Sequence, residues 1–159
     1  MKVQGKLVSN YSEKREIYEV RKLVFVEELG IDMDKVFDHK DQEAIHAVVY
    51  LEENEKEAKE HIKAVATGRL YFDGEICELD QVSVLRDYRR KKYGDLVVRM
   101  LINKGFQAGI KEIIAYVPTH LFQFFEKIGF QRNNISSDYQ EGYDLMRIRP
   151  SEIQTLCLK

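Results

Sequence analysis

The feature that most constrains this fold is a change of pattern between residues 75 and 108. Residues 75–84 are β-rich and end in the run VSV, which predicts a strand. A loop follows that crowds five basic side chains into seven positions, namely Arg86, Arg89, Arg90, Lys91 and Lys92. Gly94 comes next, and residues 95–108 carry apolar side chains at helical spacing. The chain must therefore leave a sheet, turn through a basic loop and enter a helix.

The other segments alternate between strand-like and helix-like patterns. Asp73 and Gly74 predict a hairpin turn, and the charged run at 52–61 predicts a solvated hairpin loop. Strands are expected at residues 2–9, 46–51, 62–72, 75–84 and 111–117, with two more around a polar turn within 130–148. Helices are expected at residues 11–29, 95–108 and 119–128, with a loop or short helix at 31–43. This order predicts a mixed α/β domain.

Length and charge limit the class of protein. A chain of 159 residues predicts a single domain over residues 1–159 with its own core. The net charge is −2, whereas a domain that binds duplex phosphate is expected to be strongly basic. A small anion is therefore a more natural partner for the basic run than nucleic acid.

Cysteine usage and hydropathy exclude other classes. Cys77 and Cys157 form neither a disulfide framework nor a zinc motif, which favours a reducing, cytoplasmic setting. No run approaches the roughly 20 apolar residues of a membrane helix, and no signal peptide is expected. Asp38, His39 and Asp41 lack the fixed spacing of a metal-binding set, so no metal is expected.

The basic loop has the chemistry of an anion site. The first N–H groups of a helix have no intrahelical partner and carry a partial positive charge. A loop that turns these groups toward one point can bind phosphate, and Gly94 allows a ligand to approach the backbone closely. From the residues alone, two alternatives are about equally favoured. One is a site for phosphate or pyrophosphate, and the other is a plain basic loop. A Walker-type loop is not expected, since the chain has no GK[ST] triplet.

Three motifs resemble the GNAT family of acetyl-CoA-dependent N-acetyltransferases. The segment ELDQVSVLRDYRRKKYGDLVVRML is similar to the family's strand and R-x-x-G-x-G/A loop, here Arg89 to Gly94 with Lys92 at the middle glycine. FFEKIGF, at residues 124–130, resembles the family's FYEKLGF helix end. RKLVFVEELGIDMDKVFDHKDQEAIH, at residues 21–46, resembles the N-terminal pattern of one bacterial branch, the ElaA/YjcF-like proteins. The resemblance implies a mostly antiparallel sheet that is splayed between the fourth and fifth strands and flanked by helices.

The resemblance also implies where acetyl-CoA binds. In the family, backbone amides of the loop bind the coenzyme pyrophosphate, and the preceding strand edge binds the pantetheine arm. A left-handed backbone at Lys92 would be strained. The positions that correspond here are Val82, Ser83 and Val84 for the arm, and Arg89, Arg90, Lys91, Lys92, Tyr93, Gly94 and Asp95 for the pyrophosphate.

The resemblance implies a general base on the fourth strand. Glu78 occupies the place of the glutamate that several GNAT enzymes use to accept the amine proton. Alternation along the strand places Asp80, Val82 and Val84 on the same face, and Asp80 is a second candidate. The alternative for Glu78 is an exposed strand residue or a structural ion pair.

The expected general acid departs from the family pattern. The family tyrosine that protonates the thiolate is Phe125 here, which has no proton to give and is retained only as a coenzyme contact. Three alternatives follow for the general acid. Water can protonate the thiolate, Tyr116 of the fifth strand can take the place of the family tyrosine, or the chain binds acyl-CoA without efficient transfer.

The resemblance predicts acetyl transfer to an amine, and the acceptor is left open among a small amine, a peptide terminus and a lysine. Candidate acceptor contacts are Phe25, His46, Asp80 and Tyr143. An acyl-CoA-binding sensor or interaction module is the alternative, and a nucleic-acid binder rests on the basic run alone. No membrane partner is expected. GNAT domains often pair, so a homodimer is among the states that the resemblance allows.

Overall fold

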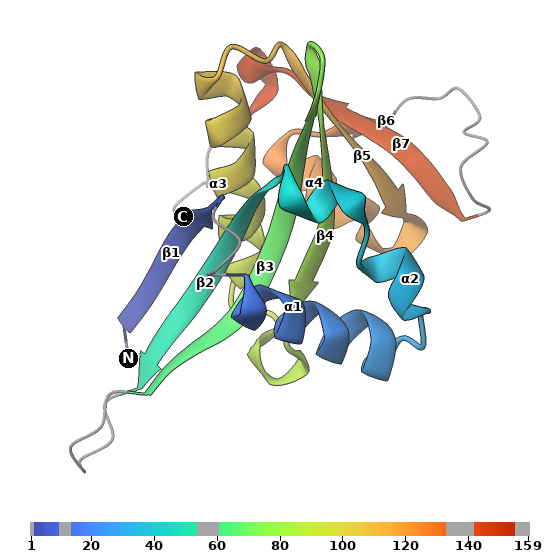
Figure 1. Cartoon of the computed structure of the whole chain (residues 1–159). Helices are drawn as coiled ribbons and strands as arrows, with labels where there is room; N and C mark the ends of the chain where they lie inside the picture. The colour runs from blue at the N-terminus through green and yellow to red at the C-terminus, as the bar shows by residue number, and fades with distance from the viewer. Residues whose placement is uncertain (1, 10–13, 54–60, 133–141, 155–159) are drawn as a thin grey trace.

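A seven-stranded sheet forms the centre of the computed structural model, which describes residues 2–9, 14–53, 61–132 and 142–154 (Figure 1). The strands lie in the order β1-β2-β3-β4-β5-β7-β6. Their bounds are β1 Lys2–Val8, β2 Ile45–Glu53, β3 His61–Asp73, β4 Ile76–Val84, β5 Glu112–Pro118, β6 Gln131–Arg132 and β7 Tyr143–Ile148. The mixed α/β class predicted from the sequence is confirmed.

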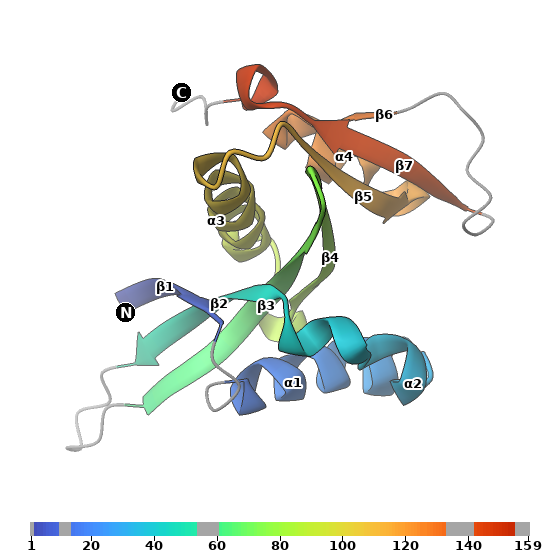
Figure 2. The same ribbon diagram turned by 45° about the horizontal axis from the view of Figure 1, so that its top comes forward.

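Helices cover both faces of the sheet (Figure 2). The first helix and α2 lie on one face, and α3 lies on the other, where α4 joins the same apolar core. The helical elements are α1 Arg15–Arg21, the π-helix η2 Lys22–Glu28, α2 Met33–Val36, α3 Tyr93–Gln107, α4 Phe122–Ile128 and the short 3-10 turns η3 His39–Gln42, η4 Arg86–Tyr88, η5 Thr119–Leu121 and η6 Pro150–Glu152. None of the helices in the described part of the chain has the length and apolar character needed to span a membrane.

The helix α3 packs against the sheet through its apolar stripe. Val97, Val98 and Leu101 have no exposed surface, as the helical spacing of the sequence predicts. Gly68 of β3 permits this close approach, since a Cβ there would lie 2.7 Å from Cγ1 of Val97. The helix that follows the basic loop is thus fixed rigidly on the sheet.

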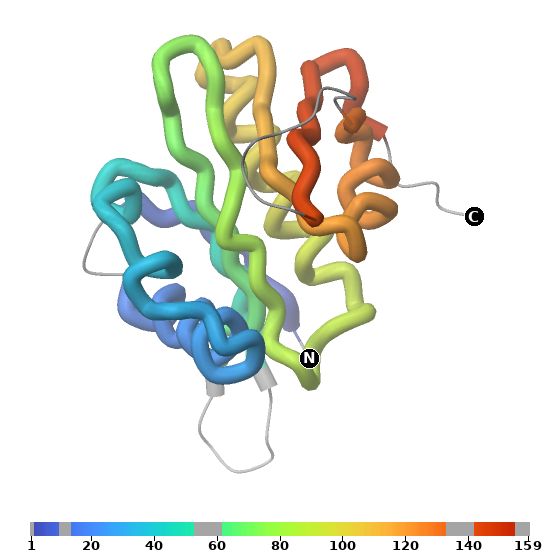
Figure 3. Tube along the Cα trace, turned by 90° about the vertical axis from the view of Figure 1, so that its right-hand side faces the viewer, coloured from blue at the N-terminus to red at the C-terminus, as the bar shows by residue number. Residues whose placement is uncertain are grey.

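Strands β4 and β5 pair over only part of their length. They are the parallel neighbours in an otherwise antiparallel sheet, and their pairing covers Ile76–Glu78 and Glu112–Ile114. Beyond Glu78 the two strands move apart (Figures 1 and 3). This confirms the splayed sheet that the resemblance implies.

A β-bulge in β4 changes which side chains share a face. Gln81 has φ 56, and the register with β3 shifts at this point, between the pairs Thr67–Ser83 and Arg69–Asp80. Cys77 lies in the core beneath α3, but so does Val82, whose Cγ2 is 3.5 Å from the Cβ position of Gly68. The expectation that Val82 and Val84 share the face of Glu78 and Asp80 is therefore wrong, because one extra residue inverts the alternation.

The N-terminal helix also differs from its prediction. A single helix was expected over residues 11–29, but the chain forms α1 and then changes to the π-helical η2. The first three residues of the predicted helix, 11–13, and most of the loop at 52–61 lie outside the described residues. A π-helix widens each turn by one residue, so periodicity for an ordinary helix does not predict it.

Candidate active site

The loop between β4 and α3 has an unusual backbone. Arg90 and Lys92 both lie in the left-handed region, at φ 64 and φ 67, and Lys92 caps α3. Successive left- and right-handed residues turn their N–H groups toward a common point. The first N–H groups of α3 add to this set because they have no intrahelical partner. The geometry can bind an anion through backbone groups, and the positive φ expected to strain Lys92 is present.

Side chains of the loop are arranged in two ways. Arg90, Lys91 and Lys92 are exposed, and the Lys91 ammonium lies 5.8 Å from the centre of the Tyr88 ring. Tyr93 is half-buried against the core, while Asp95 accepts a 2.8 Å bond from Arg99. The exposed cations give the loop its positive charge, whereas Tyr93 and Asp95 make their contacts at the start of α3.

Gly94 lies in the first turn of α3, close to the end of β4. A Cβ at this position would lie 3.3 Å from Cγ2 of Val84 and 3.5 Å from the Phe124 ring. Even an alanine there would require the Val84 side chain to move by a few tenths of an ångström. Gly94 thus brings the helix start, the strand end and α4 together.

Arg89 ties the loop to two other elements. Its guanidinium donates to both carboxylate oxygens of Glu28, at 2.7 and 2.8 Å, and its Nε donates to the Val84 carbonyl at 3.0 Å. The hydrogen bond from Arg89 holds the pKa of Glu28 below its usual value. The first arginine of the motif therefore holds η2 against the end of β4.

The end of β4 presents an open backbone edge. From Leu79 onward, β4 is hydrogen-bonded to β3 alone among the described strands. Val82 and Val84 pack in the core, and Ser83 is buried, with an Oγ that has no partner among the described residues. An extended ligand can pair with such an edge in the manner of an added strand.

Glu78 lies at the last residue pair that joins β4 and β5. Its neighbour Cys77 pairs with Ile113 and both are core residues, so Glu78 points to the opposite face. There its carboxylate lies 3.3 Å from the Lys40 ammonium, with both side chains about one-quarter exposed. Tyr71 is the direct cross-strand partner of Glu78. The carboxylate is thus accessible at the point where the strands separate, and it is also one half of an ion pair.

Two tyrosines share the face of Glu78. Ile114 is the partner of Glu78, so Tyr116, two residues further along β5, points the same way. Tyr143 follows from the antiparallel pairing with β7, in which Pro118 lies opposite Tyr143. The structure therefore brings Glu78, Tyr116 and Tyr143 to one face of the splayed region.

Asp80 is held by a buried arginine that sequence reasoning missed. Arg69 of β3 is 1% exposed and donates to both oxygens of Asp80, at 2.8 and 2.6 Å. It also binds Asp38 at 2.6 Å and Asp41 at 2.9 Å. A charged residue inside the apolar run of β3 must be paired when it is buried. The arginine within this run was therefore the one feature of the sequence that indicated a buried ion pair. Asp80 is thus placed in an ion pair and not free beside Glu78.

Asp41 connects this network to the N-terminal helix. Its carboxylate binds Arg21 at 2.7 Å, and its carbonyl accepts from Lys14 at 2.6 Å and lies 3.0 Å from Nε2 of His46. His46 is fully buried, and that burial lowers its pKa. Hence His46 lies beneath the site rather than on its surface. Phe25 is half-buried on η2.

Phe125 lies in the apolar core of α4. It is 4% exposed, and its ring forms edge contacts with Phe124 at 5.1 Å and Phe130 at 5.2 Å. The position of the family tyrosine is therefore filled by a ring that packs within the core.

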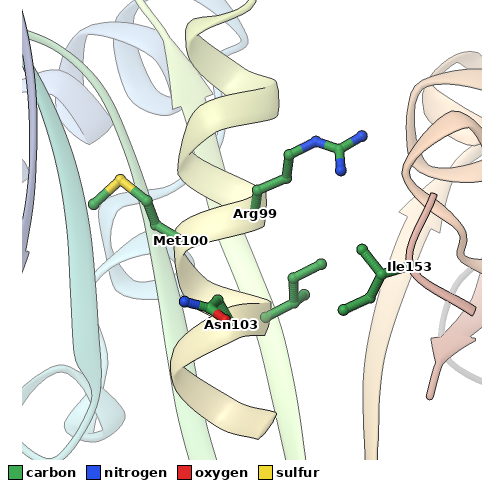
Figure 4. Close-up of a pocket in the computed structure, with 5 residues that line it drawn as sticks. Arg99, Met100, Asn103 and Ile153 are labelled. Atoms are coloured by element: carbon green, nitrogen blue, oxygen red, sulfur yellow. The ribbon is translucent and has the colours of Figure 1, made fainter. Parts of the chain in front are cut away.

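A separate hollow of about 350 Å³ lies beside α3 (Figure 4). Its lining consists of Arg99, Met100, Ile102, Asn103 and Ile153. None of these residues is predicted for the site, and the hollow is distinct from the splayed strands.

Comparison with known proteins agrees with this arrangement. The model of the acetyltransferase (GNAT) family matches residues 14–130. YjcF of Bacillus subtilis, named an N-acetyltransferase, is 24% identical over 125 residues, which cover 79% of this chain and 83% of that protein.

Solved structures share the fold at low sequence identity. Escherichia coli ElaA has a TM-score of 0.75 at 16% identity, covering 92% of this chain and 99% of its own. The PaiA N-acetyltransferase of Thermoplasma acidophilum, solved with coenzyme A, has a TM-score of 0.61 at 15% identity, with 92% and 99% coverage. The family match, together with this shared fold, makes the chain a member of the acetyltransferase (GNAT) family and an acyltransferase.

Proposed function

We propose that this protein transfers an acetyl group from acetyl-CoA to a primary amine by direct attack, with Glu78 as general base. The observation that carries the proposal is the position of Glu78. It is an accessible carboxylate at the last β4–β5 pair, on the face that also holds Tyr116. A base at this point can reach an amine that approaches a thioester held between the separating strands.

The donor side rests on backbone groups. The open edge at Val82–Val84 suits the amide-containing arm of coenzyme A, and the left-handed loop suits its pyrophosphate. PaiA, which has the same fold, binds coenzyme A. These features support acetyl-CoA as the donor.

The chemistry needs one proton acceptor and one proton donor. The amine nitrogen attacks the thioester carbonyl, and Glu78 takes the amine proton directly or through water. The tetrahedral intermediate then collapses, so the C–S bond breaks and the coenzyme thiolate leaves. Tyr116 is the proposed donor of a proton to that thiolate because it shares the face of Glu78, whereas Phe125 has no proton to give.

Release of free thiol from acetyl-CoA with a panel of primary amines tests the proposal. We expect amine-dependent turnover that Glu78→Gln lowers by about 100-fold or more, the usual contribution of a general base. Glu112→Gln is the matched control, since Glu112 is also a strand carboxylate in a partly exposed ion pair, with Arg149 at 3.2 Å. Equal losses in both variants would contradict the role of Glu78.

Binding of acyl-CoA without transfer is the second candidate function. The buried Phe125 and the Lys40–Glu78 ion pair favour it, because neither arrangement supplies a free acid or base. Tight binding of coenzyme A with no turnover of any amine would support this function instead.

A further inference from the structure

The protein holds one of its own primary amines against the proposed base. The Lys40 ammonium lies 3.3 Å from Oε2 of Glu78 and 5.2 Å from the centre of the Tyr71 ring. Tyr71 and Glu78 are cross-strand partners in β3 and β4, so the ring and the carboxylate are neighbours on one face. A carboxylate beside an aromatic face is the combination that binds ammonium groups in proteins.

Lys40 is brought there by a firmly held turn. It belongs to η3, in which the Asp38 side chain accepts from the Lys40 backbone N–H at 3.0 Å. Arg69 binds Asp38 and Asp41, and Arg21 binds Asp41 from the other side. The turn is thus anchored by buried ion pairs, whereas the Lys40 side chain remains 28% exposed. Its ammonium can leave Glu78 without any disruption of the anchor.

The protonation state of Lys40 suits a competitor better than a nucleophile. Burial lowers the pKa of Lys40, but the charge and hydrogen bond of Glu78, with the charge of Asp80, outweigh it and leave the pKa raised. Lys40 therefore stays protonated beside Glu78. A cation without a lone pair occupies the carboxylate but does not attack a thioester. An acceptor that binds there as an ammonium must likewise release a proton, to Glu78 or to water, before its nitrogen can attack.

We propose that Glu78 and Tyr71 form a binding site for a primary alkylammonium, and that Lys40 fills this site until the acceptor displaces it. This rests on the proposed function for the identity of the acceptor, and it narrows the acceptor to a primary amine on an unbranched alkyl chain. Such a chain has the shape and charge of the lysine side chain that it replaces. Lys40 is thus an internal competitor that any acceptor must displace.

Binding of n-butylammonium to the intact protein tests the site without any need for catalysis. In Lys40→Ala the probe refills the vacated position, which we expect to see as saturable shifts of the backbone amide resonances of Tyr71 and Glu78. In the unmodified protein the affinity is about tenfold lower, since a partly exposed ion pair and a cation–π contact compete with the probe. Lys35→Ala is the control for lost charge, because Lys35 is exposed on α2, and it should leave the affinity as in the unmodified protein.

Two further measurements keep the test specific. The double variant Lys40→Ala/Glu78→Gln should lose the binding, and uncharged n-butanol should cause no saturable shift in Lys40→Ala. A Lys40→Met variant fills the same space without charge and shows whether an effect comes from lost competition or from an altered turn. Unchanged n-butylammonium affinity in both Lys40 variants, with the fold intact, would overturn the proposal.

Kinetics separate this proposal from the proposed function. Lys40→Ala should lower KM for n-butylamine by about tenfold and leave KM for acetyl-CoA unchanged, because only acceptor binding is relieved. If n-butylammonium binds as expected but no variant turns over, the ammonium site stands and the proposed reaction fails. If turnover depends on Glu78 but Lys40→Ala raises KM for the amine, the reaction stands and the competitor role fails. Acetylation of Lys40 itself, seen as the mass of one added acetyl group, would also overturn the competitor role.

Discussion

The two faces of the sheet are stabilised by different interactions. Under α3, the interior consists of apolar side chains such as Val97, Leu101 and Ile113, all without exposed surface. Under α1 and η3, it contains Arg21, Arg69 and other charged groups that are almost as completely buried. The apolar face fixes the helix that follows the basic loop between β4 and α3, whereas the charged face fixes the turn that carries Lys40. The contrast teaches that apolar packing holds the helix on one face, whereas buried ion pairs hold the turn on the other.

Removal of a charge from the buried ion-pair network should have the largest destabilising effect on the protein. Asp41→Asn leaves Arg21 and Arg69 without their shared carboxylate. We expect a loss of about 3–5 kcal/mol in the free energy of unfolding, as for other broken buried ion pairs. Denaturant titration measures it, with Asp34→Asn on the exposed side of α2 as the control. A loss below about 1 kcal/mol would mean that the network behaves as a surface pair.

A cavity on the apolar face should have a somewhat smaller effect. Leu101→Ala removes a side chain with no exposed surface from the contact of α3 with the sheet. The expected cost is about 3 kcal/mol, from lost burial and the cavity that remains. Leu29→Ala is the control, because Leu29 is 59% exposed and its loss should change stability little. Similar losses in the two variants would contradict the core assignment.

Acid should weaken the charged face before it affects the apolar one. The burial of His46 lowers its pKa in the folded state, so the unfolded chain binds more protons as the pH falls below about 6.5. Stability should therefore fall with the pH through this range, because protonation would charge a buried ring next to Arg21 and Lys14. We expect His46→Asn to make stability less dependent on pH. His39→Asn, which changes an exposed residue of η3, should leave the pH dependence unchanged. An identical pH slope in all three proteins would exclude His46 as the cause.

A substitution in the basic loop between β4 and α3 should change stability least, and with the opposite sign. Lys92→Gly relieves a left-handed backbone at φ 67 and should raise the free energy of unfolding by about 1 kcal/mol. Lys91→Gly, which removes the same charge from a neighbour that is not among the positive-φ residues, should be neutral or destabilising. Calorimetric melting compares the two variants, and destabilisation by Lys92→Gly would contradict the strain.

Sequence patterns predicted the apolar face better than the charged face. Spacing alone places the buried stripe of α3, and the hairpin turn at Gly74 aligns β3 with β4. The bulge at Gln81 was missed because a positive φ at glutamine has no sequence signature comparable to glycine. It inverted the expected face of Val82 and Val84.

Long-range contacts explain the other omissions. Lys40 and Glu78 are 38 residues apart, and Arg69 and Asp38 are 31 apart, so no local pattern links them. Only the presence of one arginine, Arg69, within the apolar run of β3 indicated that acidic partners must lie nearby. The position of Glu78 could be predicted from the sequence because it follows from a motif within one strand. The residues that surround it could not, because only the folded chain brings them together.

The most direct test of the account is the change in kcat/KM for n-butylamine in Glu78→Gln and Lys40→Ala, measured side by side by thiol release from acetyl-CoA. The two residues form one ion pair, so a purely structural pair would give losses in both variants. We predict opposite signs, with a loss of about 100-fold for Glu78→Gln and a gain of about tenfold for Lys40→Ala. Losses of similar size in both variants would contradict an ammonium site that serves the base.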